Sequence, residues 1–249
     1  MKLYRFEKLE ADRCETIINK KLWISSPKEF NDLHDCRLPA IYMPSFTEVY
    51  FDKLQSMINI SYPENFDYSN SIFYRNLIED LKNYIKQAKT PGLKADIRRS
   101  YYVSAIREKI INSVGICCFF SGEINEPLLW AHYADSHKGF CVEYEYDEEQ
   151  DTSIHPVIYQ TAPIIPSARE LLLCPEESLT RLLTSKTMHW QYEKEYRLIN
   201  LFSGDDKESG RLVDLPSCLK PLQIIKGAKL QDDEGLLKGI DIPINRFHQ

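Results

Sequence analysis

Hydrophobic and polar residues alternate along several short segments of this chain. This pattern is typical of β-strands, whose successive side chains point to opposite faces. In GFCVEYEY, residues 139–146, the two predicted faces are Phe140, Val142, Tyr144 and Tyr146 against Cys141, Glu143 and Glu145. With the apolar run GICCFF, the pattern predicts one connected β core built from residues 3–6, 22–25, 116–120, 139–146 and 196–201. Further strands are predicted at residues 155–160 and 222–230.

Apolar residues at helical spacing predict helices over residues 10–21, 126–134 and 167–183, with Pro127 in the first turn of the second. Residues 46–111 have the same periodicity and predict a helical insertion. The expected fold is therefore α+β: a single domain over residues 1–249 with a mostly antiparallel β core and this insertion. The insertion is interpreted as a packing subdomain, or alternatively as a lid or a surface for a protein partner.

Composition narrows the class of protein. The net charge of the 249 residues is -6, which gives no general attraction to nucleic acid or to anionic membranes. The seven cysteines are an odd number at irregular spacing, which favours free thiols in a reducing compartment. No apolar run approaches the roughly 20 residues that span a bilayer. We expect a cytoplasmic protein with no membrane partner.

Several common catalytic motifs are missing from the sequence. It contains no GxGxxG, GxxxxGK[ST], HExxH or GxSxG. His132 and His137 are five residues apart, which does not bring them together on one helical face. A zinc site needs further ligands at suitable spacing, so no metal is expected.

The segment YEKEYRLI carries the most distinctive chemistry. Glu193, Glu195 and Arg197 stand at alternating positions, so a strand would place them on one face. The conservative interpretation is a half-exposed strand with an ion pair. Trp190 and Tyr192 favour burial instead, and a buried pair of acids needs a cation such as Arg197. We interpret this face as part of a site.

Other candidate residues lie near predicted strand and helix ends. Trp130, His132 and Tyr133 share a short helix that would line a pocket, although Trp130 is better suited to anchoring the core and His132 is equally suited to capping or local hydrogen bonding. Ser25 and Ser26 come at the end of the second strand, where their hydroxyls would face a site.

Four blocks together resemble the bacterial family called domain of unknown function 2971. They are LYRF, LWISSPKEFND, CCFFSGEINEPLLWAHYADSHKGFCVEYE and KTMHWQYEKEYRLI. The resemblance covers nearly the whole chain except the insertion. Members of that family usually have proline after the Asn-Asp pair, where this chain has Leu33.

A more remote likeness is to the ADP-ribosyltransferase fold. It implies that Arg5 binds a dinucleotide from the first strand, with Ser25 or Ser26 helping from the second. It also implies that Glu195, or else Glu193, stabilises positive charge on the ribose. Tyr192 or Trp130 would then stack on nicotinamide.

This likeness implies an NAD-using ADP-ribosyltransferase-like enzyme or an NAD glycohydrolase, in toxin or phage-defence biology. NAD would be the substrate, and the sequence leaves the acceptor open. One alternative is a metal-dependent nuclease-like effector that uses Glu193, Glu195 and His132. Another is a binding module with a degenerate site, whose helical insertion contacts a protein partner.

Overall fold

The structure of the chain is a computed structural model that describes residues 1–32, 35–36, 79, 111–150, 153–161, 175–202, 210–231 and 235–247. The predicted insertion over residues 46–111 lies outside the described residues except at positions 79 and 111. The first part of the predicted helix over 167–183 and Leu33 also lie outside them. None of the helices in the described ranges has the length and apolar character required to cross a membrane.

Nine of the described strands form one sheet, and the whole is an α+β fold with a mixed, mostly antiparallel sheet. The strands are β1 (Lys2–Glu7), β2 (Lys21–Ser25), β3 (Val114–Phe120), β4 (Phe140–Tyr146), β5 (Ile154–Pro156), β8 (Glu195–Leu201), β9 (Gly210–Asp214), β10 (Leu219–Lys226) and β11 (Ile244–Arg246). The prediction that five of them belong to one core is confirmed, because β1, β2, β3, β4 and β8 are all members.

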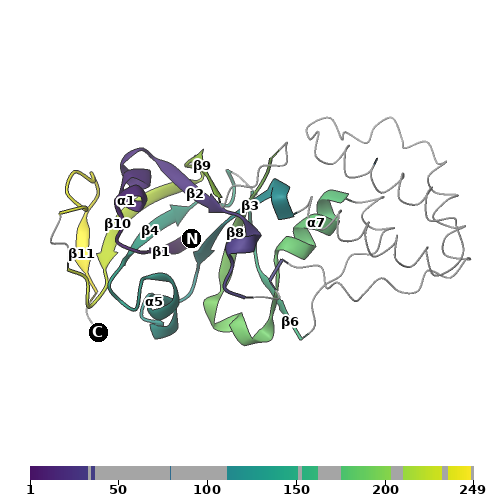
Figure 1. Cartoon of the computed structure of the whole chain (residues 1–249), viewed down its shortest axis with the longest axis horizontal. Helices are drawn as coiled ribbons and strands as arrows, with labels where there is room; N and C mark the ends of the chain where they lie inside the picture. Colours follow the sequence, from purple (N-terminus) through teal and green to yellow (C-terminus); the bar gives the residue numbers. More distant parts are fainter. Residues whose placement is uncertain are drawn as a thin grey trace, which may run out of the picture.

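The sheet forks at its central strand, β3 (Figure 1). Along one edge β3 pairs with β8 over its whole length, from Val114–Leu201 to Phe120–Glu195. The other edge is shared: β1 pairs with β3 at Phe120, and β2 pairs with it at Ile116. Strands β4 and β10 extend the sheet beyond β1, and β9 extends it beyond β2.

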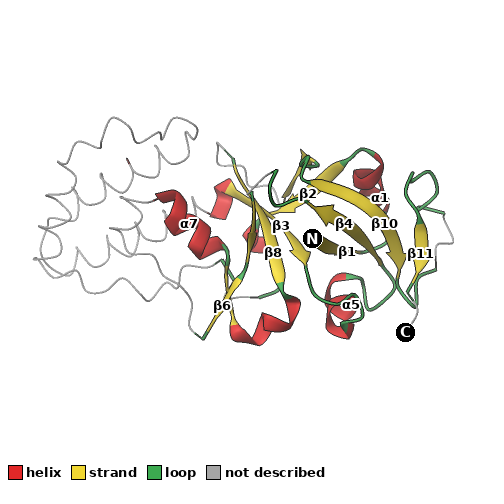
Figure 2. Cartoon of the chain, turned by 180° about the vertical axis from the view of Figure 1, so that it is seen from behind, coloured by secondary structure: helices red, strands yellow, loops and turns green. Residues whose placement is uncertain are grey.

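Each face of the sheet packs a separate hydrophobic cluster, as the period of two requires. On the first face lie Leu3, Ile24, Phe119, Val142 and Leu198, covered in part by helix α1 (Ala11–Ile18) through Cys14. The second face carries Phe6, Phe120 and Cys141 and packs against helix α5 (Pro127–Tyr133) through Leu129 and Trp130. Figures 1 and 2 show α1 and α5 at separate places on the sheet.

The predicted strand over residues 155–160 is two strands. Its first half, β5, pairs with β8, and its second half, β6 (Ile158–Gln160), pairs in parallel with β7 (Ser185–Thr187). Between them Val157 donates to the carbonyl of Glu195 at 2.9 Å, and Ile158 donates to that of Thr184 at 2.7 Å. The chain therefore leaves the main sheet after Pro156, and its next strand, β6, holds β7 beside the start of β8.

Three further elements connect this region. Helix α7 (Pro175–Leu183) leads into β7, and the 3-10 helix η3 (Met188–Glu193) joins β7 to β8. The 3-10 helix η1 (Pro27–Glu29) follows β2. The predicted strand over 222–230 ends at Lys226. Gly227 follows, where an added Cβ would lie 2.3 Å from the carbonyl oxygen of His137.

Candidate functional site

Five charged side chains meet in the protein interior where β7, η3 and β8 converge. They are Asp35, Lys186, Glu193, Glu195 and Arg197, and we refer to them as the buried charge network. Glu193 and Arg197 are 0% exposed and Glu195 is 2% exposed. Charges removed from water in this way require partners, and each of the five has at least one.

The two glutamates come together through a turn rather than through a continuous strand. Glu193 is the last residue of η3, and Lys194 adopts a left-handed conformation with φ 46° before β8 starts at Glu195. The prediction that Glu193 belongs to the alternating strand is therefore wrong. Both carboxylates nevertheless reach one ammonium, with Lys186 Nζ at 2.6 Å from Glu193 and 2.9 Å from Glu195.

Arg197 is the other cation of the network. Its guanidinium donates to both oxygens of Asp35, at 2.9 and 2.5 Å, and to Glu195 Oε1 at 2.7 Å. Burial would raise the pKa of Glu195, but Arg197 and Lys186 together hold that pKa well below its ordinary value. The two cations therefore favour the ionised form of Glu195.

The pKa of Glu193 shifts in the opposite direction to that of Glu195, because the neighbouring charges offset the effect of burial less fully. Burial raises the pKa of Glu193 to about 7, against the lowering effect of Lys186 and with a further rise from the charge of Glu195. Tyr133 donates its hydroxyl to Glu193 Oε1 at 2.6 Å. Tyr133 is half-buried, so it links the carboxylate to the surface, whereas Lys186 is buried. A carboxyl with a raised pKa beside a half-buried hydroxyl is a candidate for proton transfer.

Four aromatic side chains from α5 and η3 lie over this end of the network. His132, Tyr133, Trp190 and Tyr192 form what we refer to as the aromatic layer. The ring of Trp190 is 6.0 Å from that of His132 and 6.2 Å from that of Tyr192, and Lys186 Nζ is 4.8 Å from its centroid. Trp190 and Tyr192 are half-buried and His132 is exposed, so a planar ligand has ring faces and edges to contact.

The structure does not bring Arg5 to this site. Arg5 Nε donates to Glu7 at 2.5 Å, Nη2 donates to the carbonyl of Trp23 at 3.0 Å, and Nη1 contacts the sulfur of Cys117. Cys117 lies on the first face of β3, whereas Glu195 hydrogen-bonds Cys118 on the second. Arg5 and Glu195 therefore occupy opposite faces of the sheet. The hydrogen bond from Arg5 to the carbonyl of Trp23 connects β1 with β2.

The other predicted cofactor-binding residues are also separated. Ser26 caps η1 by accepting from the backbone N–H of Lys28 at 3.3 Å, and Ser25 is half-buried at the end of β2. Trp130 is 0% exposed and donates from its indole N–H to the carbonyl of Ile124 at 2.6 Å. Trp130 thus anchors the core, while His132 and Tyr192 are the two that reach the aromatic layer.

Sequence patterns alone missed two members of the site, Asp35 and Lys186, and they did not connect the pocket candidate Tyr133 with Glu193. The available signal was charge balance, because two buried acids beside one arginine require a second cation. Lys186 stands in the same sequence block, KTMHWQYEKEYR, as both glutamates. Asp35 had no such signal, since 162 positions separate it from Arg197.

The site has no arrangement typical of metal binding. Within the described ranges, no three histidine, cysteine or carboxylate side chains are grouped so as to hold a metal ion. Glu193 and Glu195 share the Lys186 ammonium instead, and His132 lies beside the rings of Tyr133 and Trp190. The nuclease-like alternative requires Glu193, Glu195 and His132 to surround one metal ion, which is not the arrangement of these side chains in the structure.

We expect Glu193→Gln to change how stability depends on pH. A carboxyl whose pKa is raised in the folded state stabilises the fold below its unfolded pKa, and this contribution is lost as pH rises through about 7. Glutamine does not titrate. Relative to the wild type, the variant should therefore gain roughly 2 kcal/mol in free energy of unfolding between pH 5 and pH 8. Urea unfolding at both pH values measures this. An unchanged difference would show that Glu193 does not titrate there.

Comparison with known proteins gives one match. A protein-family model described as "Protein of unknown function (DUF2971)" matches residues 129–198, which supports the resemblance to that family over this segment of the chain. The matched segment runs from α5 into β8 and contains every member of the network and the aromatic layer except Asp35. No curated protein and no solved structure matches the chain.

Proposed function

We propose that the aromatic layer and Glu193 form a site that cleaves the glycosidic bond between a ribose and a planar cationic ring, with NAD as the substrate to test first. The observation that supports this most is the position of Glu193. It is a buried carboxyl that accepts a hydrogen bond from Tyr133 beneath half-buried aromatic rings, and burial raises its pKa to about 7. A general base works best when its pKa lies near the operating pH.

The proposed reaction assigns one task to each group. The bond between ribose C1′ and the pyridinium nitrogen breaks, its electron pair stays on the nitrogen, and nicotinamide leaves as a neutral ring. A water oxygen adds to C1′, and its proton passes to Glu193. In an ADP-ribosyltransferase, the nucleophile of an acceptor takes the place of that water. The guanidinium of Arg197 keeps Glu195 in its ionised form, and the carboxylate adds negative potential near the developing positive charge on the ribose.

Arg5, Ser25 and Ser26 have no part in this version of the proposal. The likeness to the ADP-ribosyltransferase fold would place them on the dinucleotide, but Arg5 is committed to Glu7, Trp23 and Cys117 on the first face of β3. Recognition of the ring therefore falls to Trp190 and Tyr192.

A second candidate is a binding module in which the network is only a rigid frame. The observation that favours it is the exposure of Glu193, which is 0%, so that a substrate must displace Tyr133 to touch the carboxylate. Such a module would bind its ligand on the aromatic layer without turnover.

A calorimetric titration with NAD, followed by measurement of nicotinamide release, separates these candidates. Binding with release supports the enzyme, and binding without release supports the module. If NAD does not bind at millimolar concentration, the proposal for this substrate fails.

Trp190→Ala should weaken NAD binding about tenfold, because stacking of a cationic ring on an indole face is worth on the order of 1 kcal/mol or more. The matched control is His189→Ala, which removes an exposed ring from the neighbouring position of η3. Calorimetry on both variants measures the change. Equal NAD affinities for the two variants would show that Trp190 does not contribute to NAD binding.

A further inference from the structure

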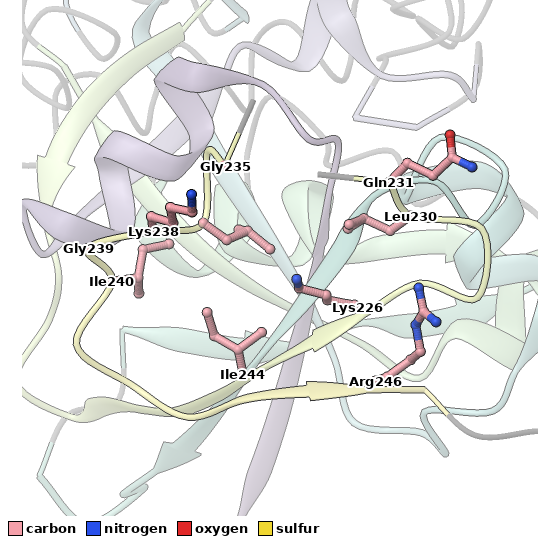
Figure 3. A pocket seen from close by; sticks show the side chains of 10 residues that line it. Lys226, Leu230, Gln231, Gly235, Lys238, Gly239, Ile240, Ile244 and Arg246 are labelled. Carbon is pink, nitrogen blue, oxygen red and sulfur yellow. The ribbon is translucent and has the colours of Figure 1, made fainter. Parts of the chain in front are cut away.

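A hollow of about 670 Å³ opens at the end of the main sheet where β10 pairs with β11 (Figure 3). Part of its lining is apolar and comes from Leu230, Leu237, Ile240 and Ile244. Leu230 and Leu237 are buried, whereas Ile244 is 38% exposed. The volume lies within the range of about 300–1,000 Å³ that is typical of small-molecule sites.

Three cationic side chains surround this hollow: Lys226 from β10, Arg246 from β11, and Lys238 from the segment between these strands. Figure 3 shows the Lys226 ammonium pointing toward the middle of the space. In the part of the chain that the structure describes, no carboxylate forms an ion pair with any of the three. A cluster of three cations around one hollow is unexpected in a protein of net charge -6.

The wall that carries Lys238 is a tight turn over residues 235–239. Gly235 and Gly239 have φ values of 69° and 88°, in the left-handed region that other residues adopt only with strain. The backbone N–H of Lys238 donates to the carbonyl of Gly235 at 2.9 Å. This turn places Lys238 on the rim of the hollow, across from Arg246 (Figure 3).

We propose that this hollow binds a small phosphorylated molecule with an apolar or planar body. A phosphate or diphosphate group matches the three cations, and the guanidinium of Arg246 can donate two hydrogen bonds to phosphate oxygens. The apolar lining receives the rest of the ligand. A small molecule fits better than nucleic acid, because a polyanion requires an extended basic surface and the chain as a whole is acidic.

This inference does not rest on the proposed glycosidic cleavage. Strands β4, β1 and β3 lie between β10 and the strand that carries Glu195, so the two sites share no residue. NAD itself contains a diphosphate. The probes are therefore inorganic pyrophosphate and ADP, which lack nicotinamide, and adenosine serves as the uncharged comparison.

Calorimetry on the full chain tests the proposal. ADP and pyrophosphate should bind, and adenosine should bind at least tenfold more weakly than ADP. Lys226→Gln and Arg246→Gln should each weaken ADP binding about tenfold or more, the effect of losing one charge-assisted contact. The matched control is Lys220→Gln, an equal change of charge at an exposed position of the same strand, which should stay within about twofold.

Asp232, Asp233 and Glu234 stand in the sequence between Gln231 and Gly235, which both line the hollow, and these acids lie outside the described residues. Their combined amide variant should bind ADP at least as tightly as the wild type. The proposal is overturned if that variant loses binding, if Lys220→Gln weakens binding as much as Lys226→Gln, or if neither ADP nor pyrophosphate binds at millimolar concentration. Binding of a single-stranded oligonucleotide but not of ADP would also overturn it.

Discussion

Glu193→Gln should lower the rate of nicotinamide release from NAD by about 100-fold or more. The amide keeps the shape of the side chain, and its one carbonyl oxygen can accept from either Tyr133 or Lys186, but its NH2 group cannot accept from the other and the side chain cannot take a proton from the attacking nucleophile. Loss of general base catalysis typically costs between about 100-fold and 10,000-fold. NAD affinity should change far less, because the proton moves only in the transition state.

The matched control for this measurement is Glu143→Gln. Glu143 is another buried glutamate on the sheet, 3% exposed, which accepts from Gln223 at 2.8 Å and pairs with Lys2. Its substitution changes a buried carboxyl without touching the site and should leave the release rate within about threefold, in line with additivity of distant positions. An active wild type with an equally active Glu193→Gln variant would show that this carboxyl is not the base.

Arg197→Met should lower the free energy of unfolding by about 3–5 kcal/mol. The substitution leaves Asp35 without its bidentate partner and Glu195 with Lys186 alone, and removing one member of a buried ion pair carries a cost of this size. Urea unfolding at pH 7 measures the loss. The exposed pair between Lys21 and Asp214 provides the control, since Lys21→Met should cost no more than about 1 kcal/mol.

Neutralising an acid tests the physical reason for that loss. In the double variant Glu195→Gln/Arg197→Met, a neutral amide replaces the Glu195 carboxylate, so that only the Asp35 carboxylate lacks its partner. The double variant should therefore regain part of the stability lost in Arg197→Met alone. If the double variant is less stable by the sum of the two single losses, charge imbalance is not the cause. A loss below about 1 kcal/mol for Arg197→Met would mean that the network does not support the fold.

The candidate site was predictable in part. The alternation of Glu195 and Arg197 is local, and their shared face is confirmed by the 2.7 Å hydrogen bond between them. The role assigned to Glu195 depended on its partners, which alternation cannot reveal. Because Arg197 and Lys186 both act on Glu195, its pKa falls while that of Glu193 rises. The proposed general base is consequently Glu193, whereas the resemblance to the ADP-ribosyltransferase fold put Glu195 first and Glu193 second.

The sequence by itself determined the elements whose signal is local: the strands β1, β3, β4 and β8, the division of their residues between two faces, and the proline that starts α5. The period of two decides which side of a strand a residue occupies, whatever that strand pairs with. Only the tertiary structure decided the register that pairs Tyr4 with Phe120 and Phe120 with Glu195, and this register sets Arg5 and Glu195 on opposite faces. It also brought Asp35 to Arg197 and Lys226 to Arg246, because strand pairing and burial of charge depend on residues far apart in the chain.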